Sequence, residues 1–100
     1  MIHVIWEFRA LPEARQEFLR HYGPEGSWAR LFRQAEGYER TLLLADRSAQ
    51  NRCFTVDVWR DLGAFERFKG AHADAYRALD AQCEELTESE KLVGIFEEIR

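Results

Sequence analysis

The order of strand-like and helix-like segments constrains the fold of this chain more than any other feature of its sequence. Segment 2–9 alternates apolar and more polar residues at the period of a β-strand, and its apolar face carries Ile2, Val4, Trp6 and Phe8. Further strands are predicted over 38–45, 52–59 and 91–97, where aliphatic, aromatic and β-branched residues concentrate. With only 100 residues, the chain is expected to form one domain, 1–100.

Helical patterns fill the two intervals between the first and second and between the third and fourth predicted strands. Pro12 suits the first turn of a helix, which the Gly23-Pro24-Glu25-Gly26 segment should end. A second short helical piece follows before Gly37, with an apolar stripe of Trp28, Leu31, Phe32 and Ala35. Asp61 can cap a long helix over 62–86, whose stripe is Phe65, Phe68, His72, Tyr76 (or Ala75), Leu79, Cys83 and Leu86.

The resulting order, β-α-β-β-α-β, predicts an α+β, ferredoxin-like fold with a four-stranded antiparallel sheet. Right-handed crossovers would place both helical segments on one face of that sheet. The opposite face is expected to carry Ile5, Cys53, Thr55, Trp59 and Ile95, a set too apolar to face water. We therefore expect a homodimer through the sheet face, a dimeric α/β barrel, with Glu7 and Asp57 on the same face toward the partner sheet.

Composition and charge argue against several classes of function. The net charge is −4 and no Lys/Arg cluster is present, so nucleic acid is not an expected partner. No signal-peptide pattern and no apolar run of membrane-spanning length occur, so we expect a cytoplasmic protein without a membrane partner. Cys53 and Cys83 lack metal-ligand spacing, and no phosphate-binding Gly loop is found, so neither a metal site nor another cofactor is expected.

Three stretches carry a resemblance to a known family: Val4-Ile-Trp-Glu-Phe-Arg9, Phe54-Thr-Val-Asp-Val-Trp59 and Trp59-Arg-Asp-Leu-Gly-Ala-Phe65. With the element order, they resemble the antibiotic biosynthesis monooxygenase-like superfamily of dimeric α/β barrels. The segment Tyr22-Gly-Pro-Glu-Gly-Ser-Trp28 is similar to a branch of that superfamily without an established activity. The resemblance implies a pocket between helices and sheet, lined here by Trp6, Phe8, Tyr22, Trp28, Phe32, Phe54, Val56, Phe68, His72 and Tyr76.

The resemblance implies that this pocket binds a small aromatic or apolar molecule and oxidises it without metal or flavin. Such a cofactor-independent monooxygenase must remove a proton from its substrate and stabilise the resulting anion. His72, with Tyr22 or Tyr76, is the candidate for handling the proton. Arg30, Arg33 and Arg67 are the candidates for stabilising the anion.

Other interpretations compete with an oxygenase. His72 can also be a structural histidine that hydrogen-bonds a backbone carbonyl or a tyrosine. Glu7 and Asp57 can be either an acid–base pair or carboxylates paired with an arginine or a hydroxyl, for which Arg9, His3 and Thr55 are the candidates. The protein can also be a non-catalytic ligand-binding or structural homodimer whose own rings fill the pocket. A haem-binding or haem-degrading protein is a lesser alternative, because those relatives use a histidine further along the helix and an asparagine where Phe8 aligns.

Overall fold

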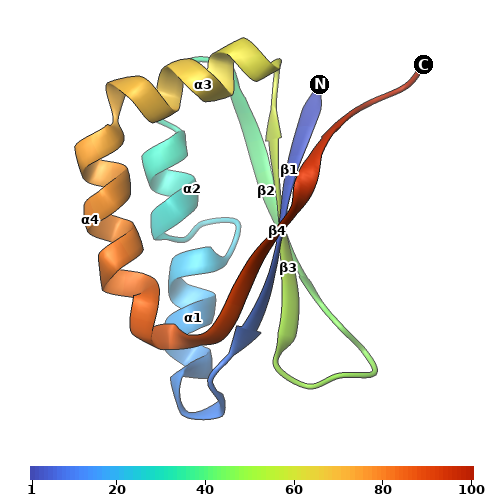
Figure 1. The fold of residues 1–100 in the computed structure, drawn as a ribbon, viewed down its shortest axis with the longest axis vertical. Helices are drawn as coiled ribbons and strands as arrows, with labels where there is room; N and C mark the ends of the chain where they lie inside the picture. The colour runs from blue at the N-terminus through green and yellow to red at the C-terminus, as the bar shows by residue number, and fades with distance from the viewer.

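A computed structural model describes residues 1–100 and has one sheet covered on a single side by helices (Figure 1). The sheet consists of β1 (Ile2–Ala10), β2 (Tyr38–Ala45), β3 (Arg52–Trp59) and β4 (Thr87–Glu97). Its order is β2-β3-β1-β4, and every neighbouring pair is antiparallel. The ferredoxin-like α+β fold predicted from the sequence is therefore confirmed.

The helical layer is more divided than the sequence suggested. It consists of η1 (Pro12–Ala14), α1 (Arg15–Tyr22), α2 (Ser27–Phe32), α3 (Leu62–Ala71), α4 (Ala73–Cys83) and η2 (Glu84–Leu86). The long helix expected over 62–86 is thus three pieces, with a break at His72 between α3 and α4. The last strand begins at Thr87 instead of residue 91, because the polar residues after Leu86 pair with β1 at the edge of the sheet. None of the helices has the length and apolar character needed to cross a membrane.

Local sequence explains where several of these elements begin and end. The Asp61 carboxylate accepts a hydrogen bond from the Ala64 N–H at 2.8 Å, which caps α3 as predicted. Gly26 sits against the carbonyl oxygens of Arg20 and His21, where an added Cβ would lie only 2.6 Å from each. The absence of a side chain there lets α2 fold back closely on α1.

The register of β1 with β3 corrects the predicted faces of β3. Ile2 pairs with Trp59, Val4 with Asp57, Trp6 with Thr55 and Phe8 with Cys53. Directly paired residues share a face, so all of these side chains point toward the helices.

The prediction that Cys53, Thr55 and Trp59 face the partner sheet is therefore wrong; Trp59 is fully buried under the helices. The prediction that Glu7 and Asp57 share a face is also wrong, because Glu7 pairs with Phe54 on the other side. Both faces of β3 carry large apolar side chains, and the more uniformly apolar one, with Phe54, Val56 and Val58, lies away from the helices, so period-two alternation indicated the wrong face.

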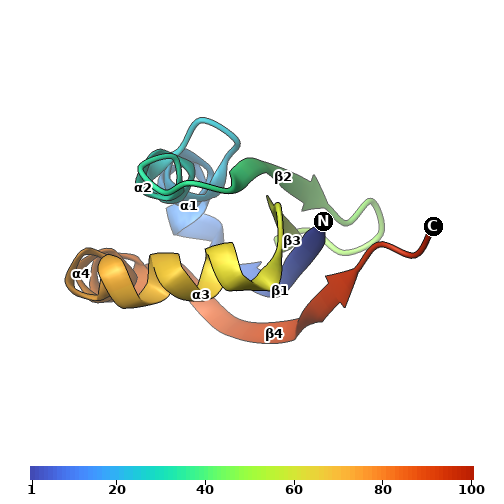
Figure 2. The ribbon, with the colours of Figure 1, turned by 90° about the horizontal axis from the view of Figure 1, so that it is seen from above.

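The helices leave one side of the sheet uncovered (Figure 2), and exposed apolar side chains lie on that side. Ile5 lies there as predicted and pairs with Val56, whereas Ile95 pairs with Val4 and belongs to the other face. Leu42 and Leu44, opposite Val56 and Phe54, are 39% and 48% exposed. Phe96, opposite His3, is 47% exposed.

The core position of Trp59 generates a stability prediction. Trp59→Ala should lower the free energy of unfolding by about 3–5 kcal/mol, because it leaves a cavity among rings that cannot close over it. Trp59→Phe should cost less, and Ile99→Ala, at a residue 98% exposed, should change little. Urea unfolding followed by circular dichroism measures all three. A loss below about 1 kcal/mol for Trp59→Ala would contradict its placement in the core.

Candidate functional site

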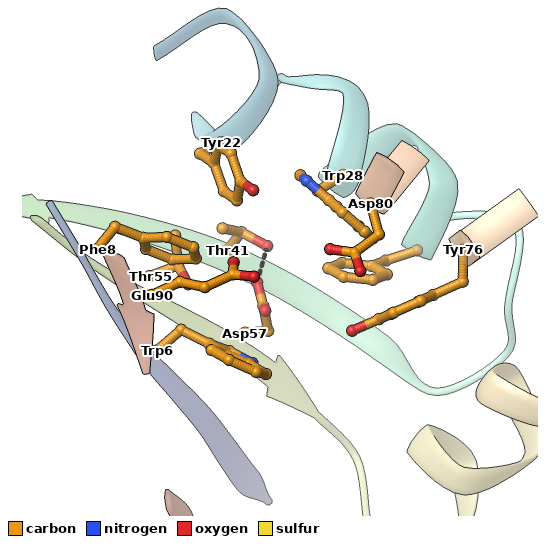
Figure 3. Close-up of a pocket in the computed structure, with 11 residues that line it drawn as sticks. Trp6, Phe8, Tyr22, Trp28, Thr41, Thr55, Asp57, Tyr76, Asp80 and Glu90 are labelled. Carbon is orange, nitrogen blue, oxygen red and sulfur yellow. Dashed lines mark hydrogen bonds between the residues drawn. The ribbon is translucent and has the colours of Figure 1, made fainter. Parts of the chain in front are cut away.

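A cavity of about 100 Å³, partly open to solvent, lies between the helices and the covered face of the sheet (Figure 3). It is lined by Trp6, Phe8, Tyr22, Trp28, Phe32, Thr41, Thr55, Asp57, Tyr76, Asp80 and Glu90. An engineered apolar cavity of about 150 Å³ accepts benzene, so this space is of the order needed for a single ring. Its opening to solvent leaves room for a larger molecule to extend outward.

Aromatic rings form the walls of the cavity and hold one another in place. Tyr22 ends α1 and Trp28 lies in the first turn of α2, and the close turn at Gly26 brings their ring centroids to 6.2 Å. Tyr22 also lies 4.6 Å from Phe8, and Trp28 meets Tyr76 edge-on at 5.0 Å. These ring contacts hold the aromatic walls of the cavity in fixed positions.

Two buried polar groups in this recess have unusual environments. Trp28 is only 7% exposed, and its buried indole N–H has no hydrogen-bond partner. Burial raises the pKa of the Tyr22 hydroxyl well above its ordinary value, with smaller contributions from Cys83 and Glu90. Tyr22 therefore stays protonated and can act as a hydrogen-bond donor.

Asp57 is the acid–base group on the floor of the cavity. It is 8% exposed and accepts one hydrogen bond, from the Thr41 hydroxyl at 2.7 Å. Since Thr41 uses its proton for Asp57, the Tyr38 hydroxyl donates to Thr41 at 2.8 Å. Burial raises the pKa of Asp57 from 3.8 to about 6, and the Thr41 hydrogen bond opposes this rise. The carboxyl group can therefore exchange a proton near neutral pH.

Two further carboxylates stand at the rim of the cavity. Asp80 from α4 and Glu90 from β4 are exposed, and both are directed toward the space above Asp57 (Figure 3). Partial burial, together with Asp80 and Glu84, raises the pKa of Glu90. The pKa of Tyr76 is raised to about 12, first by burial and then by Asp80, Asp57 and Glu90. No Lys, Arg or His lines the cavity, and the carboxylates do not form a group that could hold a metal ion.

The structure brings six of the predicted pocket residues together around this cavity: Trp6, Phe8, Tyr22, Trp28, Phe32 and Tyr76. Phe54 and Val56 do not line it, because their side chains lie on the face of the sheet away from the helices. Phe68 is 1% exposed in the core beneath the helices and does not reach the cavity.

His72, the predicted catalytic residue, also lies outside the cavity. The break between α3 and α4 turns its ring onto Phe68, with 5.2 Å between ring centroids, and it lines a separate shallow groove with Arg67. The helical stripe that placed His72 beside Tyr76 assumed one continuous helix. Of the other predicted cations, Arg30 bonds the Glu25 carbonyl and Arg33 pairs with the Glu25 carboxylate at 2.6 Å.

Residues that sequence reasoning did not assign to the cavity are Thr41, Thr55, Asp57, Asp80 and Glu90. An aspartate inside the apolar segment Val56-Asp57-Val58 was a usable signal, since an acid in a buried strand needs a reason to be there. Asp80 stands one helical turn after Tyr76, so it shares that face of α4. No local pattern identified Glu90, whose place depends on the pairing of β4 with β1.

This lining does not suit haem. The cavity offers no histidine to bind iron, and its carboxylates would oppose the propionates of a haem group. The residues present therefore do not fit the haem alternative.

Comparisons with known proteins agree with the architecture. A family model described as antibiotic biosynthesis monooxygenase matches residues 1–82. No curated protein matches the sequence.

A protein of Deinococcus radiodurans described as a candidate antibiotic biosynthesis monooxygenase is 21% identical, with a TM-score of 0.77, over 100% of this chain and 94% of that chain. Rv0793 of Mycobacterium tuberculosis is 19% identical, with a TM-score of 0.73, over 99% and 95% of the two chains. SnoaB, a cofactor-independent oxygenase from Streptomyces nogalater, is 24% identical, with a TM-score of 0.61, over 99% and 93%. At these identities the likeness establishes the fold.

The raised pKa of Asp57 generates a prediction about stability and pH. Because its pKa is higher in the folded state than its ordinary value, its contribution to stability is full below about pH 4 and is lost as pH rises through about 6. Asp57→Asn should therefore be more stable than the wild type at pH 7, by about 3 kcal/mol at most, and similar to it near pH 4. Urea unfolding at a series of pH values measures the difference, and a difference that does not vary with pH would contradict the environment assigned to Asp57.

Proposed function

The chain belongs to the antibiotic biosynthesis monooxygenase family, and from this premise we propose that it binds a small aromatic or apolar molecule in the cavity and oxidises it without metal or flavin. The observation that carries the proposal is Asp57, a buried carboxyl group that faces an aromatic-walled space and can exchange a proton near neutral pH. The SnoaB structure, which shares the fold, is that of a cofactor-independent oxygenase.

In the proposed reaction Asp57 acts as the general base. Its carboxylate takes a proton from a substrate whose ring system forms a stable anion, such as a phenol or an enol. The anion reduces O₂ directly: a ring CH₂ group, present in the keto form of such a phenol or enol, and O₂ become a carbonyl group and water, so the ring carbon supplies all four electrons and both hydrogens. Trp6 and Trp28 position the ring, and the Tyr76 hydroxyl is available as a hydrogen-bond donor.

The hydrogen-bond chain behind Asp57 supports this role. Thr41 donates to Asp57 and Tyr38, which is half-buried, donates to Thr41. These contacts fix the orientation of the carboxyl group and leave its other oxygen free to face the cavity. A carboxylate with one oxygen held by a hydrogen bond can present its other oxygen to the substrate as a base.

One observation favours the second candidate, a ligand-binding protein without turnover. An oxygenase of this type gains from positive charge or donors near the developing anion. The lining contains no cation, and Asp57, Asp80 and Glu90 add negative charge instead. Binding without oxidation would need no such stabilisation.

We also propose that two copies pair through the uncovered face of the sheet. Leu42, Leu44 and Phe96 lie there, each more than a third exposed, over three of the four strands together with the half-buried Ile5 of β1. A second copy with the same face would bury this surface in an isologous two-fold dimer. Arg52, which pairs with Glu7 and Asp46 at 2.8 Å each, places a group of paired charges at the margin of that face.

Oxygen uptake tests the proposed oxidation. We expect wild-type protein to consume O₂ with one or more members of a panel of polycyclic phenols, and Asp57→Asn to lose at least about 100-fold in kcat/KM. The wild-type rate should rise with pH through about 6 and then level off, as the carboxyl group becomes a base.

Two control variants accompany this measurement. Asp74→Asn makes the same change at an aspartate whose side chain is 99% exposed, and it should keep the wild-type rate. His72→Ala should also keep it, because His72 lies outside the cavity. Full activity in Asp57→Asn would remove Asp57 from the mechanism, and loss of activity in His72→Ala would return the catalytic role to the histidine.

Sedimentation equilibrium tests the dimer. Wild-type protein should sediment as a dimer of about twice 11.8 kDa at micromolar concentration. Leu44→Glu should shift the equilibrium toward monomer by at least about tenfold in dissociation constant, because it places a charge in an apolar interface. Leu62→Glu, at a similarly exposed leucine of the helical layer, is the matched control. A monomeric wild-type protein would overturn the proposal.

A further inference from the structure

The charge of the cavity points to a class of ligand, an inference that rests on the proposed function of this site. The lining unites aromatic rings with three carboxylates, and neither Asp57, Asp80 nor Glu90 has an ion-pair partner. We propose that the ligand bound here carries a protonated amine beside its ring. The amine would be the positive charge that the cavity itself lacks.

The first argument is that Asp57 lacks the cationic partner that two other partly buried carboxylates of the protein have. Glu7 and Asp46 are half-buried and share Arg52 at 2.8 Å each. Asp57 is more deeply buried, yet it has only the Thr41 hydroxyl as a partner. A buried carboxylate without a cation costs free energy, and a ligand ammonium group would remove that cost on binding.

The rim gives the second argument. Asp80 lies on α4 and Glu90 on β4. Together with Asp57, their negative charges raise the pKa of the Tyr76 hydroxyl. Negative charges grouped around one apolar opening raise the local concentration of cations. The nearest cation on α3, Lys69, lies over the Tyr76 ring at 5.6 Å but is not among the residues that line the cavity.

The rings and the unpaired indole give an independent argument that something binds here. Indole and phenol faces attract ammonium groups, most strongly where water is excluded. The buried N–H of Trp28 forms no hydrogen bond with the protein, although the Tyr22 hydroxyl and the Cys83 thiol lie near it, so a ligand oxygen would satisfy it. The cavity thus suits a molecule with an oxygen-bearing ring and an amine: the oxygen would bond Trp28, and the amine would meet the carboxylates (Figure 3).

Such a ligand also removes the difficulty noted for the oxidation. The anion formed when Asp57 takes a proton has no protein cation near it. An ammonium group on the same molecule would lie close to the new negative charge and offset it. The substrate would then supply the electrostatic stabilisation that other active sites take from the protein.

Three small phenols of similar size test the inference as probes: tyramine, tyrosol and 4-hydroxyphenylacetate. They share the hydroxyphenyl ring and carry, respectively, a positive, a neutral and a negative tail at neutral pH. We expect tyramine to bind at least about tenfold more tightly than tyrosol, and 4-hydroxyphenylacetate to bind most weakly. Titration of the wild-type protein, followed by the indole N–H resonances of Trp6 and Trp28 in NMR spectra, gives the three dissociation constants.

Variants at the rim locate the effect. Glu90→Gln, at an exposed carboxylate, should weaken tyramine binding by about two- to fivefold and leave tyrosol binding unchanged, because only the charged probe loses a partner. Asp74→Asn removes a carboxylate from the same helix as Asp80 but outside the cavity, and should change neither constant.

The outcomes separate this inference from the proposed function. Equal affinity for tyramine and tyrosol, or an equal effect of Glu90→Gln on both, would overturn the cationic ligand and leave the oxidation to be judged by oxygen uptake. If none of the probes shifts the indole resonances at about 10 mM, the cationic ligand is overturned, and the oxidation of polycyclic phenols is still decided by oxygen uptake.

Discussion

The pairing of β1 with β3 is the interaction on which the rest of this structure depends. It sets Trp59 opposite Ile2 and Asp57 opposite Val4, and so decides which side chains of β3 lie under the helices. One end of β3 then supplies the centre of the aromatic core, and its middle supplies the carboxyl group of the cavity. A shift of one residue would exchange the two faces, bury Phe54 in place of Thr55 and remove Asp57 from the site.

The cavity exists because the helical layer is interrupted at two places. The turn at Gly26 folds α2 back on α1, so that Tyr22 and Trp28 form one wall as neighbouring rings. The break at His72 redirects α4, which carries Tyr76 and Asp80 over the sheet as the opposite wall. Rings that meet edge-on keep these walls apart, and the space between them is polar only at its floor and rim.

Sequence patterns predicted the elements well and the site in part. Period-two and helical spacing predicted the four strands, residue type predicted the cap at Asp61, and the family resemblance predicted the six aromatic residues around the cavity. They failed at His72, where a continuous apolar stripe gave no sign that the helix would end and restart. They failed at Phe54 as well, because an apolar strand with apolar neighbours on both sides carries no mark of its buried face.

By itself, then, the sequence determined the order of elements, the ferredoxin-like fold and an excess of aromatic residues, since these follow from local spacing and composition. Only the tertiary structure decided which face of β3 meets the helices, and it thereby placed Asp57 in the cavity instead of beside Glu7. It also brought Asp80 of α4 and Glu90 of β4 together at the rim of the cavity. The reason is that strand register and helix breaks depend on contacts between distant segments, which no local window of sequence contains.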